Sequence, residues 1–316
     1  MPEMKPSRDG YGLGMVDLAE KDKRVVVLGA DLTASTRANW FKDKFPDRFF
    51  SIGIAEANMV NVAAGLSLVG KIPFVCTYGV FVAGRAWDQV RTTVCYANLN
   101  VKLGGAHGGI SVGPDGATHQ ALEDIALMRC LPNMTVVVPC DAVETRKATV
   151  AIGKMHGPAY VRFGREPIPV ITNEKTPFTL GKAETFRDGS DLSIIACGYM
   201  VAEALNAAET LAKEDKVGAR VINLHTVKPI DRAAIAKAAA ETGAIVTAEE
   251  HQVMGGFGSA VAEVAAQECP VPMRMVGIQD RFGESGEPEE LLEAFGCCAR
   301  SIVAAAREVL KQKRGS

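Results

Sequence analysis

The most informative part of the sequence is Gly113-Pro-Asp-Gly-Ala-Thr-His-Gln-Ala-Leu-Glu-Asp-Ile-Ala-Leu-Met-Arg129. It places a carboxylate, Asp115, and an imidazole, His119, in one glycine-bounded turn. The turn runs into apolar residues at helical spacing, so we expect a helix to begin there. In α/β proteins, ligands bind where strands end and helices begin. The stretch therefore predicts a binding site.

A second imidazole lies close to this turn. The apolar run 99–106 predicts a strand, and His107 closes that run before Gly108 and Gly109. A single loop histidine is more often solvated than catalytic. Here, however, two of the five histidines in the chain flank one glycine-rich turn, which favours a functional site.

Composition limits the function classes. At 316 residues the chain is long enough for two domains, and its formal charge of −2 gives no basic face for nucleic acid. No apolar run reaches the roughly 18 residues that span a membrane, so we expect a soluble protein. The eight cysteines form no Cys-x-x-Cys pair, and we expect no signal peptide. We expect reduced, mostly buried thiols in a cytoplasmic protein, the adjacent Cys297 and Cys298 included.

The first part of the chain alternates strand-like runs with helical patterns. Continuous apolar runs are typical of parallel strands buried on both faces. We expect helices at 57–69, 85–96 and 142–152, and strands at 24–29, 49–52, 72–77, 99–106, 135–139 and 159–163. The pattern indicates an α/β domain with helices on both faces of the sheet.

A break in this pattern predicts a second domain. Residues 167–191 are rich in Pro, Thr, Lys, Gly and Asp, which indicates a connecting segment. Beyond it, strands are expected at 192–197, 219–224, 244–248 and 273–277, with helices between them. The prediction is two doubly wound α/β domains at 1–172 and 191–316, joined by a linker at 173–190.

The turn and its surroundings resemble a known family. The pattern Gly-x-Asp-Gly-x-Thr-His-Gln, followed by an apolar helix and Arg129, resembles the signature of transketolases and, slightly less well, of deoxyxylulose-phosphate synthases. The resemblance extends from about Arg8 to the end of the chain. It implies a pyrimidine-binding domain followed by a transketolase C-terminal domain, as in the smaller, C-terminal subunit of a split transketolase.

The resemblance gives Glu56 a catalytic role. Glu56 lies in Ile52-Gly-Ile-Ala-Glu-Ala-Asn-Met59, where a strand is followed by an apolar helix. A carboxylate entering such surroundings needs a partner, although an ordinary first-turn glutamate is the plainer alternative. In the family, this glutamate hydrogen-bonds N1′ of the aminopyrimidine of thiamine diphosphate. Tyr78 and Phe81 are the implied aromatic neighbours of that ring, and Asp31 is implied to support the cofactor. The spacing after Phe81 departs from the family by about one residue, which leaves open which ring stacks.

The residues that hold a sugar phosphate in the family have counterparts here. By the resemblance, Arg8, Ser35, His119 and Arg165 face phosphate and Asp115 faces the donor's C2 hydroxyl. His107 is implied to act at the reacting carbonyl and hydroxyl. Guanidinium, hydroxyl and imidazole groups suit this task because they donate hydrogen bonds to phosphate oxygens. The acidic and glycine-rich segment 247–259 is interpreted as structural or as part of an interface.

The chain is implied to hold half a site. The family binds the cofactor's diphosphate through Mg²⁺ (or Ca²⁺) with a Gly-Asp-Gly motif, which does not occur in this sequence. The metal is therefore assigned to a separate diphosphate-binding subunit, and no metal ligand to this chain. We expect a heterotetramer with a homodimeric core that transfers a two-carbon ketol unit between sugar phosphates.

Three alternatives stay open at this point. A deoxyxylulose-phosphate-synthase-like enzyme shares the turn, although the synthases lack a histidine at the place of His107 and are single long chains. The β subunit of a 2-oxoacid dehydrogenase would explain the architecture and Glu56, but not the turn at His119. A non-catalytic regulatory subunit is the alternative from another class, and the joint presence of Glu56, His107, Asp115 and His119 argues against it.

Overall fold

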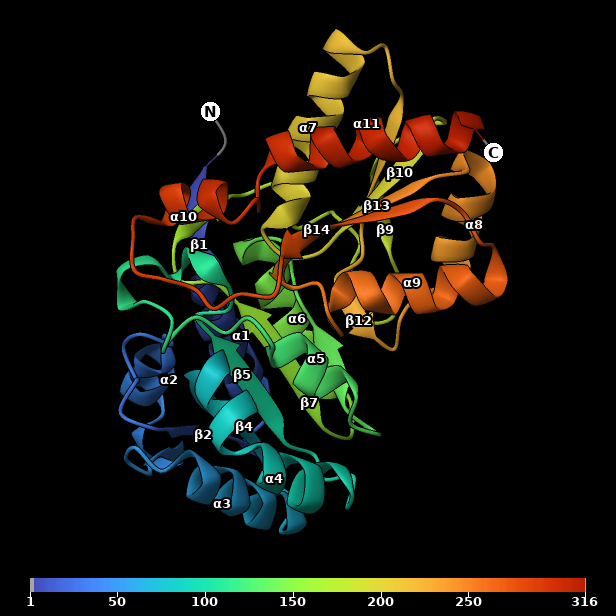
Figure 1. Cartoon of the computed structure of the whole chain (residues 1–316). Helices are drawn as coiled ribbons and strands as arrows, with labels where there is room; N and C mark the ends of the chain where they lie inside the picture. Colours follow the sequence, from blue (N-terminus) through green and yellow to red (C-terminus); the bar gives the residue numbers. More distant parts are fainter. Residues whose placement is uncertain (1–2, 316) are drawn as a thin grey trace.

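The computed structural model describes residues 3–315, which form two α/β halves packed against each other (Figure 1). The first half is built on a seven-stranded sheet in the order β12-β6-β7-β5-β4-β2-β3. All neighbouring strands in it are parallel except β12 and β6. The strands are β2 (Val25–Gly29), β3 (Phe49–Ser51), β4 (Ile72–Tyr78), β5 (Lys102–Ala106), β6 (Thr135–Val137), β7 (Ala159–Phe163) and β12 (Thr226–Lys228).

Helices cover both faces of this sheet because its strands are apolar on both sides. In β2, Val25 and Val27 pack toward one face, and Val26 and Leu28 pack toward the other. The first face is covered by α1 (Ser7–Lys21), α2 (Ala38–Lys44) and α6 (Ala142–Lys154), and the second by α3 (Glu56–Leu68), α4 (Trp87–Gln89) and α5 (Asp124–Arg129). The first half is therefore doubly wound, as predicted.

The second half repeats this plan on a five-stranded sheet, in the order β14-β13-β10-β11-β9. Its strands are β9 (Glu184–Arg187), β10 (Leu192–Ala196), β11 (Ala219–Asn223), β13 (Ile245–Gln252) and β14 (Met273–Ile278), of which only β9 is antiparallel. One face packs on α7 (Met200–Glu214) and α11 (Ala299–Gly315), and the other on α8 (Arg232–Thr242) and α9 (Phe257–Glu268). The short α10 (Pro288–Ala294) lies against the 3-10 turn Ile110–Asp115.

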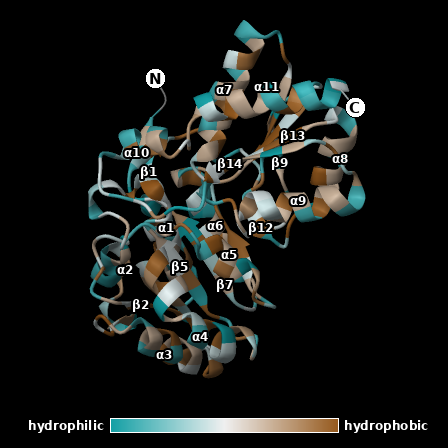
Figure 2. Cartoon of the chain, viewed as in Figure 1, coloured by the Kyte–Doolittle hydropathy of each residue, from teal (hydrophilic) through white to brown (hydrophobic). Residues whose placement is uncertain are grey.

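The amphipathic pattern of α11 shows how the outer helices are held. Its buried residues recur at helical spacing: Ile302, Val303, Ala306, Val309 and Leu310. Figure 2 shows the hydrophobic colours of this helix interrupted by hydrophilic ones, in keeping with one buried and one exposed face. Among residues 3–315, no helix is both long and apolar enough to cross a membrane.

The two halves are interlocked by a strand and by a shared core. β12 belongs to the second half of the chain but pairs with β6 at the edge of the first sheet. A single hydrophobic cluster contains Val136 and Met128 from the first half together with Ile222 and Phe257 from the second. The position of each half is therefore fixed relative to the other.

Several elements differ from the sequence-based expectation. The segment 173–190, predicted as a linker, contains β9, and β1 (Met4–Pro6) pairs with β8 (Pro167–Pro169). The helix expected at 85–96 is a short α4 flanked by π-helical turns at Phe81–Arg85 and Val90–Cys95. A π turn holds one more residue than an α-helical turn, and such turns recur at functional sites. Of the eight thiols, Cys130 is exposed and Cys269 is half-buried; the other six are buried.

Candidate active site

Four aromatic and imidazole rings meet at the carboxyl ends of β4 and β5. Tyr78 is the last residue of β4, and its ring stacks on that of His107, with centroids 3.9 Å apart. Phe81 lies parallel to Tyr78 at 5.7 Å. His119 meets both rings edge-on, at 5.9 Å from Tyr78 and 5.3 Å from Phe81. The turn around His119 and the end of β5 therefore converge, as the sequence predicts.

His107 is held in an unusual backbone conformation and is almost completely buried. Its φ is 58°, in the left-handed region, and its exposed fraction is 1%. Burial lowers its pKa to about 3, with further lowering from the charges of Arg8 and Arg165 and from His119. Its Nδ1 has no hydrogen-bond partner within residues 3–315. The ring is therefore neutral at physiological pH and keeps one nitrogen available.

Two arginines form a cationic flank beside these rings. Arg8, in the first turn of α1, donates from Nη1 to the carbonyl of Ser35 at 3.2 Å. Arg165 follows β7 and donates from Nη1 to Asp115 Oδ1 at 3.0 Å and to the carbonyl of Val112 at 3.1 Å. Burial and the nearby Arg37 lower the pKa of Arg8, and Nε of Arg8 has no partner in the described part of the chain. The flank is suited to an anionic group.

Glu56 is a buried carboxylate at the amino end of α3, with an exposed fraction of 4%. Its neighbours in the sequence are mostly apolar, and its one ion pair among the described residues is with Arg85, Nη1 to Oε1 at 3.4 Å. The guanidinium of Arg85 also lies over the ring of Phe81, 4.1 Å from the centroid. Glu56 and the ring cluster are therefore linked through Arg85.

Asp31 differs from the other predicted site residues. It is exposed just beyond β2, with φ of 57°, and no hydrogen bond or ion pair of the described residues joins its side chain to the rings. Ser35 is half-buried and contacts Arg8 through its carbonyl, while Thr118 Oγ1 lies 2.8 Å from His119 Nδ1. The structure thus brings Tyr78, Phe81, His107 and His119 into one ring cluster, joins Glu56 to it, and places Arg8, Ser35, Asp115 and Arg165 at its flank.

Sequence reasoning missed two further contacts of this region. Arg85 follows Phe81 by four residues, about one helical turn. Residues at that spacing lie on the same face of a helix, so the sequence could have predicted the contact between the guanidinium and the ring. Glu250 Oε1 accepts a hydrogen bond from the backbone N–H of Ser111 at 2.6 Å. These two residues are 139 positions apart, and no local pattern in the sequence signals their contact.

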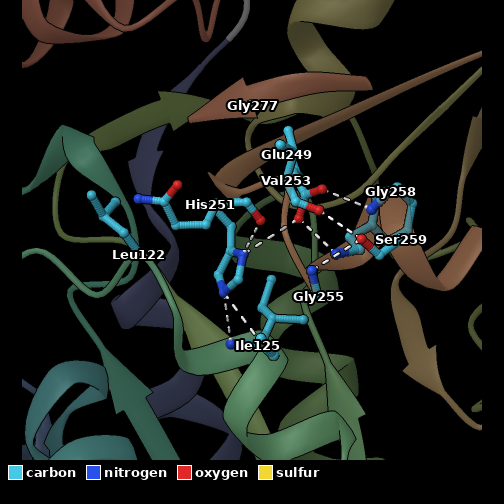
Figure 3. A network of polar contacts seen from close by, with 12 residues as sticks. Leu122, Ile125, Glu249, His251, Val253, Gly255, Gly258, Ser259 and Gly277 are labelled. Carbon is cyan, nitrogen blue, oxygen red and sulfur yellow. Dashed lines mark hydrogen bonds and ion pairs between the residues drawn. The ribbon is translucent and has the colours of Figure 1, made fainter. Parts of the chain in front are cut away.

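The acidic segment at the end of β13 is a structural network outside the ring cluster (Figure 3). Glu249 accepts hydrogen bonds from the backbone N–H groups of Phe257 at 2.6 Å and Gly258 at 2.7 Å, and so caps α9. His251 Nε2 accepts from the N–H of Ile125 at 3.1 Å, at the amino end of α5. The network joins the two halves, consistent with the structural interpretation from the sequence.

The residues fit the pyrimidine end of thiamine diphosphate. A buried carboxylate with one ion pair, beside a partly exposed phenyl ring, matches an aminopyrimidine that needs both a hydrogen-bond partner and a flat apolar neighbour. Within residues 3–315, no group of three or more His, Cys, Asp and Glu side chains is arranged to hold a metal ion.

Comparison with known proteins identifies the family. The transketolase pyrimidine-binding domain matches residues 3–170, and the transketolase C-terminal domain matches residues 181–302. The 6-deoxy-6-sulfo-D-fructose transketolase subunit SqwH of a Clostridium species (strain MSTE9) is 47% identical, over 97% of this chain and 95% of that protein. An apulose-4-phosphate transketolase subunit of Phocaeicola vulgatus is 40% identical, over 94% of this chain and 95% of that protein.

The similarity extends to solved structures and to the neighbouring enzyme class. A split gene transketolase, solved as an inactive beta4 tetramer, superimposes with a TM-score of 0.92 at 47% identity, covering 98% of this chain and 99% of that one. The 1-deoxy-D-xylulose-5-phosphate synthase 1 of Geobacter sulfurreducens is 40% identical, but this chain covers only 48% of its length. The chain therefore belongs to the transketolase family and carries its pyrimidine-binding and C-terminal domains.

Proposed function

We propose that this chain contributes the pyrimidine side of a thiamine-diphosphate site and, with a separate diphosphate-binding subunit, transfers a two-carbon ketol unit from a ketose phosphate to an aldose phosphate. The observation that carries the proposal is the link from a buried carboxylate to a ring cluster with a cationic flank. Glu56 connects through Arg85 to Phe81, and the rings connect His107 and His119. A regulatory subunit would have no need of this combination.

Glu56 and Phe81 are proposed to hold the cofactor's pyrimidine ring. Thiamine diphosphate supplies a nucleophilic carbon for ketol transfer when it is bound. Glu56 is proposed to hold a proton at the pyrimidine N1′ through its buried carboxyl group. Phe81 is half-buried, whereas Tyr78 is only 7% exposed and covered by His107, so Phe81 is the better stacking surface. Asp31 remains a proposed supporting residue without a contact that carries the role.

The substrate is proposed to lie between the two arginines and the histidines. Arg8, Arg165, Ser35 and His119 would donate hydrogen bonds to the terminal anionic group, and Asp115 would accept one from a sugar hydroxyl. His107 would hydrogen-bond the reacting carbonyl and hydroxyl as a neutral imidazole, because its pKa is lowered to about 3. A neutral ring can donate at one nitrogen and accept at the other, as proton movement at a carbonyl requires.

The cationic flank could bind more than one kind of anionic group on the donor sugar. The names of two relatives describe sugars with a sulfo group and with a phosphate. Two guanidinium groups and an imidazole suit either anion. We therefore propose an anionic ketose donor, with a sugar phosphate as the first to test.

The partner is proposed to supply the diphosphate and metal side of the site, with Mg²⁺ or Ca²⁺. The sequence has no Gly-Asp-Gly motif, and large apolar side chains are exposed close to residues of the candidate site. Ile54, two residues before Glu56, is 73% exposed, and Phe282 is 85% exposed beside a cavity that Ala117 of the His119 turn also lines. Exposed apolar surface of this kind is typical of protein interfaces. A heterotetramer with a homodimeric core, located in the cytoplasm, is the proposed assembly.

Glu56→Gln and Glu56→Ala test the catalytic assignment in the reconstituted complex. We expect both to lower kcat about 100-fold or more, the usual scale for loss of a proton-transfer group, with the melting temperature within a few degrees of the parent. Glu209→Gln, an exposed change on α7, is the control. Unchanged ketol transfer in Glu56→Ala would favour the regulatory alternative. Formation of deoxyxylulose phosphate from pyruvate would favour the synthase, and turnover of 2-oxoacids with a lipoyl carrier would favour the dehydrogenase.

A further inference from the structure

In the loop that carries His107, three backbone N–H groups donate hydrogen bonds, one of them to the other half of the chain. Side chains also bond two of its carbonyls: Gln120 Nε2 donates to that of Ile110 at 3.2 Å and Arg165 donates to that of Val112. Gly108 N–H donates to the carbonyl of Phe163 at 3.1 Å, and Gly109 N–H donates to the carbonyl of Ala121 at 3.0 Å. The third bond runs from Ser111 N–H to Glu250 Oε1 at 2.6 Å. Only this third bond ends on a side chain.

Glu250 fits closely against this loop and is itself anchored. It lies in β13 and is 6% exposed. A β-carbon built on Gly109 would collide with its carboxylate, and Gly109 has a φ of 102°. Arg162 donates from Nη2 to the carbonyls of Glu250 and Ala121, at 2.9 Å each. The backbone of Glu250 is therefore held beside the loop, and its carboxylate bonds the Ser111 N–H.

The backbone of His107 needs such support. A left-handed conformation is unfavourable at a residue with a β-carbon and persists only when its surroundings hold it. The ring of His107 has no hydrogen bond at Nδ1 within the described residues, so its place depends on the loop and on stacking with Tyr78.

We propose that Glu250, from the C-terminal domain, is a positioning residue for His107. It holds the Ser111 N–H and fills the space beside Gly109, and so keeps the loop in the conformation that presents the imidazole to the reacting atoms. The inference rests on the proposed function of His107. It assigns the C-terminal domain a part in catalysis, exerted across the boundary between the two halves.

The neighbouring glutamate offers a matched control. Side chains alternate along a strand, so Glu249 and Glu250 point to opposite faces of β13. Figure 3 shows Glu249 directed toward Gly258, where its carboxylate caps α9. Both glutamates are buried and both accept backbone hydrogen bonds. They differ in that only Glu250 touches the His107 loop.

The first test compares variants in the complex reconstituted with the diphosphate-binding subunit. Glu250→Ala removes the acceptor, and we expect kcat to fall on the order of 100-fold, the scale of a small misplacement of a catalytic group. Glu250→Gln keeps a carbonyl oxygen for Ser111 and should restore kcat to within about fivefold of the parent. Glu249→Ala should lower the melting temperature but change kcat less than about fivefold. An equal loss of kcat in Glu249→Ala would overturn the proposal.

A double variant separates positioning from general destabilisation. If Glu250 acts through His107, Glu250→Ala added to His107→Ala should lower kcat by less than about twofold further, because coupled residues are not additive. If Glu250→Ala lowered kcat by the same factor with His107→Ala present as it does in the parent, the proposal would be contradicted.

Hydrogen exchange provides a readout that needs no activity. In Glu250→Ala, the peptide covering residues 107–112 should exchange at least about tenfold faster, with Glu250→Gln and Glu249→Ala close to the parent. Equal protection in Glu250→Ala and the parent would overturn the positioning role. A parent complex that lacks ketol transfer would instead contradict the proposed function, and hydrogen exchange would still decide the role of Glu250.

Discussion

At the scale of single residues, burial and charge set the state of each group in the candidate site. His107 lies beside two arginines and is buried, and both conditions disfavour the imidazolium. Glu56 lies buried at the amino end of α3 and pairs with Arg85. The proposed chemistry uses the neutral imidazole together with this buried carboxyl group.

Arg165 should govern donor binding more than turnover. Arg165→Met removes the guanidinium that pairs with Asp115 and is proposed to face the donor's phosphate. We expect KM for xylulose 5-phosphate to rise about 10- to 100-fold, as loss of a charged hydrogen bond implies, with kcat changed less than about fivefold. Steady-state kinetics of the complex measure this, with the exposed Arg300→Met on α11 as control. An unchanged KM would contradict the assignment.

Lys102 gives a prediction about stability and pH. It is fully buried in β5, and its Nζ donates to the carbonyls of Met155 at 3.1 Å and Gly157 at 2.6 Å. Burial lowers its pKa to about 7, from an ordinary value of 10.5. Between these values the unfolded chain binds more protons than the folded one, so this residue makes stability rise as pH rises.

Unfolding in urea at about pH 7 and about pH 9.5 measures that contribution. We expect the free energy of unfolding of the parent to rise more over this interval than that of Lys102→Met. The exposed Lys154→Met should follow the parent. Parallel pH profiles for the parent and Lys102→Met would show that Lys102 keeps an ordinary pKa.

At the scale of elements, apolar patterning predicts the central strands well. The run at 72–77 corresponds to β4, because parallel strands buried on both faces are mostly apolar. The run at 159–163 corresponds to β7, although it includes Arg162, whose buried charge is paired with Asp124. The apolar run of β13 ends at 248, but the strand continues to Gln252, since Glu249 and His251 find buried partners. Such partners come from α5 and α9, so the local sequence does not reveal them.

Replacing glycine by alanine should change stability in opposite directions at two positions, Gly109 and Gly65. Gly109→Ala adds a β-carbon at a φ of 102° against Glu250, so we expect a loss of stability above about 1 kcal/mol and a loss of ketol transfer. In α3, Gly65 has open space around its β-carbon position, and Gly65→Ala should raise the stability of the isolated chain by about 0.5 to 1 kcal/mol. Thermal unfolding measures both, and a neutral Gly109→Ala would contradict the close fit of this loop.

Contacts between distant elements explain which parts of the site the sequence does not reveal. The motif around Asp115 and His119 can be recognised because its residues are close in the chain. Glu250 cannot, because its contact with Ser111 depends on how the second half packs on the first. The composition of segment 173–190 predicts a linker, yet the segment contributes β9 to the edge of the second sheet.

At the scale of the whole molecule, the two halves act as one body. β12 extends the first sheet from the second half, and a single core contains residues of both. This packing brings Glu250 to the His107 loop, and Ile54, two residues before Glu56, is exposed. Both halves of the chain therefore contribute to the arrangement of the ring cluster and its loop.

This chain is proposed to hold half of a ketol-transfer site. The most direct test measures turnover of xylulose 5-phosphate with ribose 5-phosphate, with thiamine diphosphate and Mg²⁺ present, while this chain is titrated into a diphosphate-binding subunit. We predict no turnover by either chain alone. As this chain is added, the turnover rate should rise linearly and reach its maximum when the two chains are present in equal amounts. Turnover by this chain alone would contradict the account.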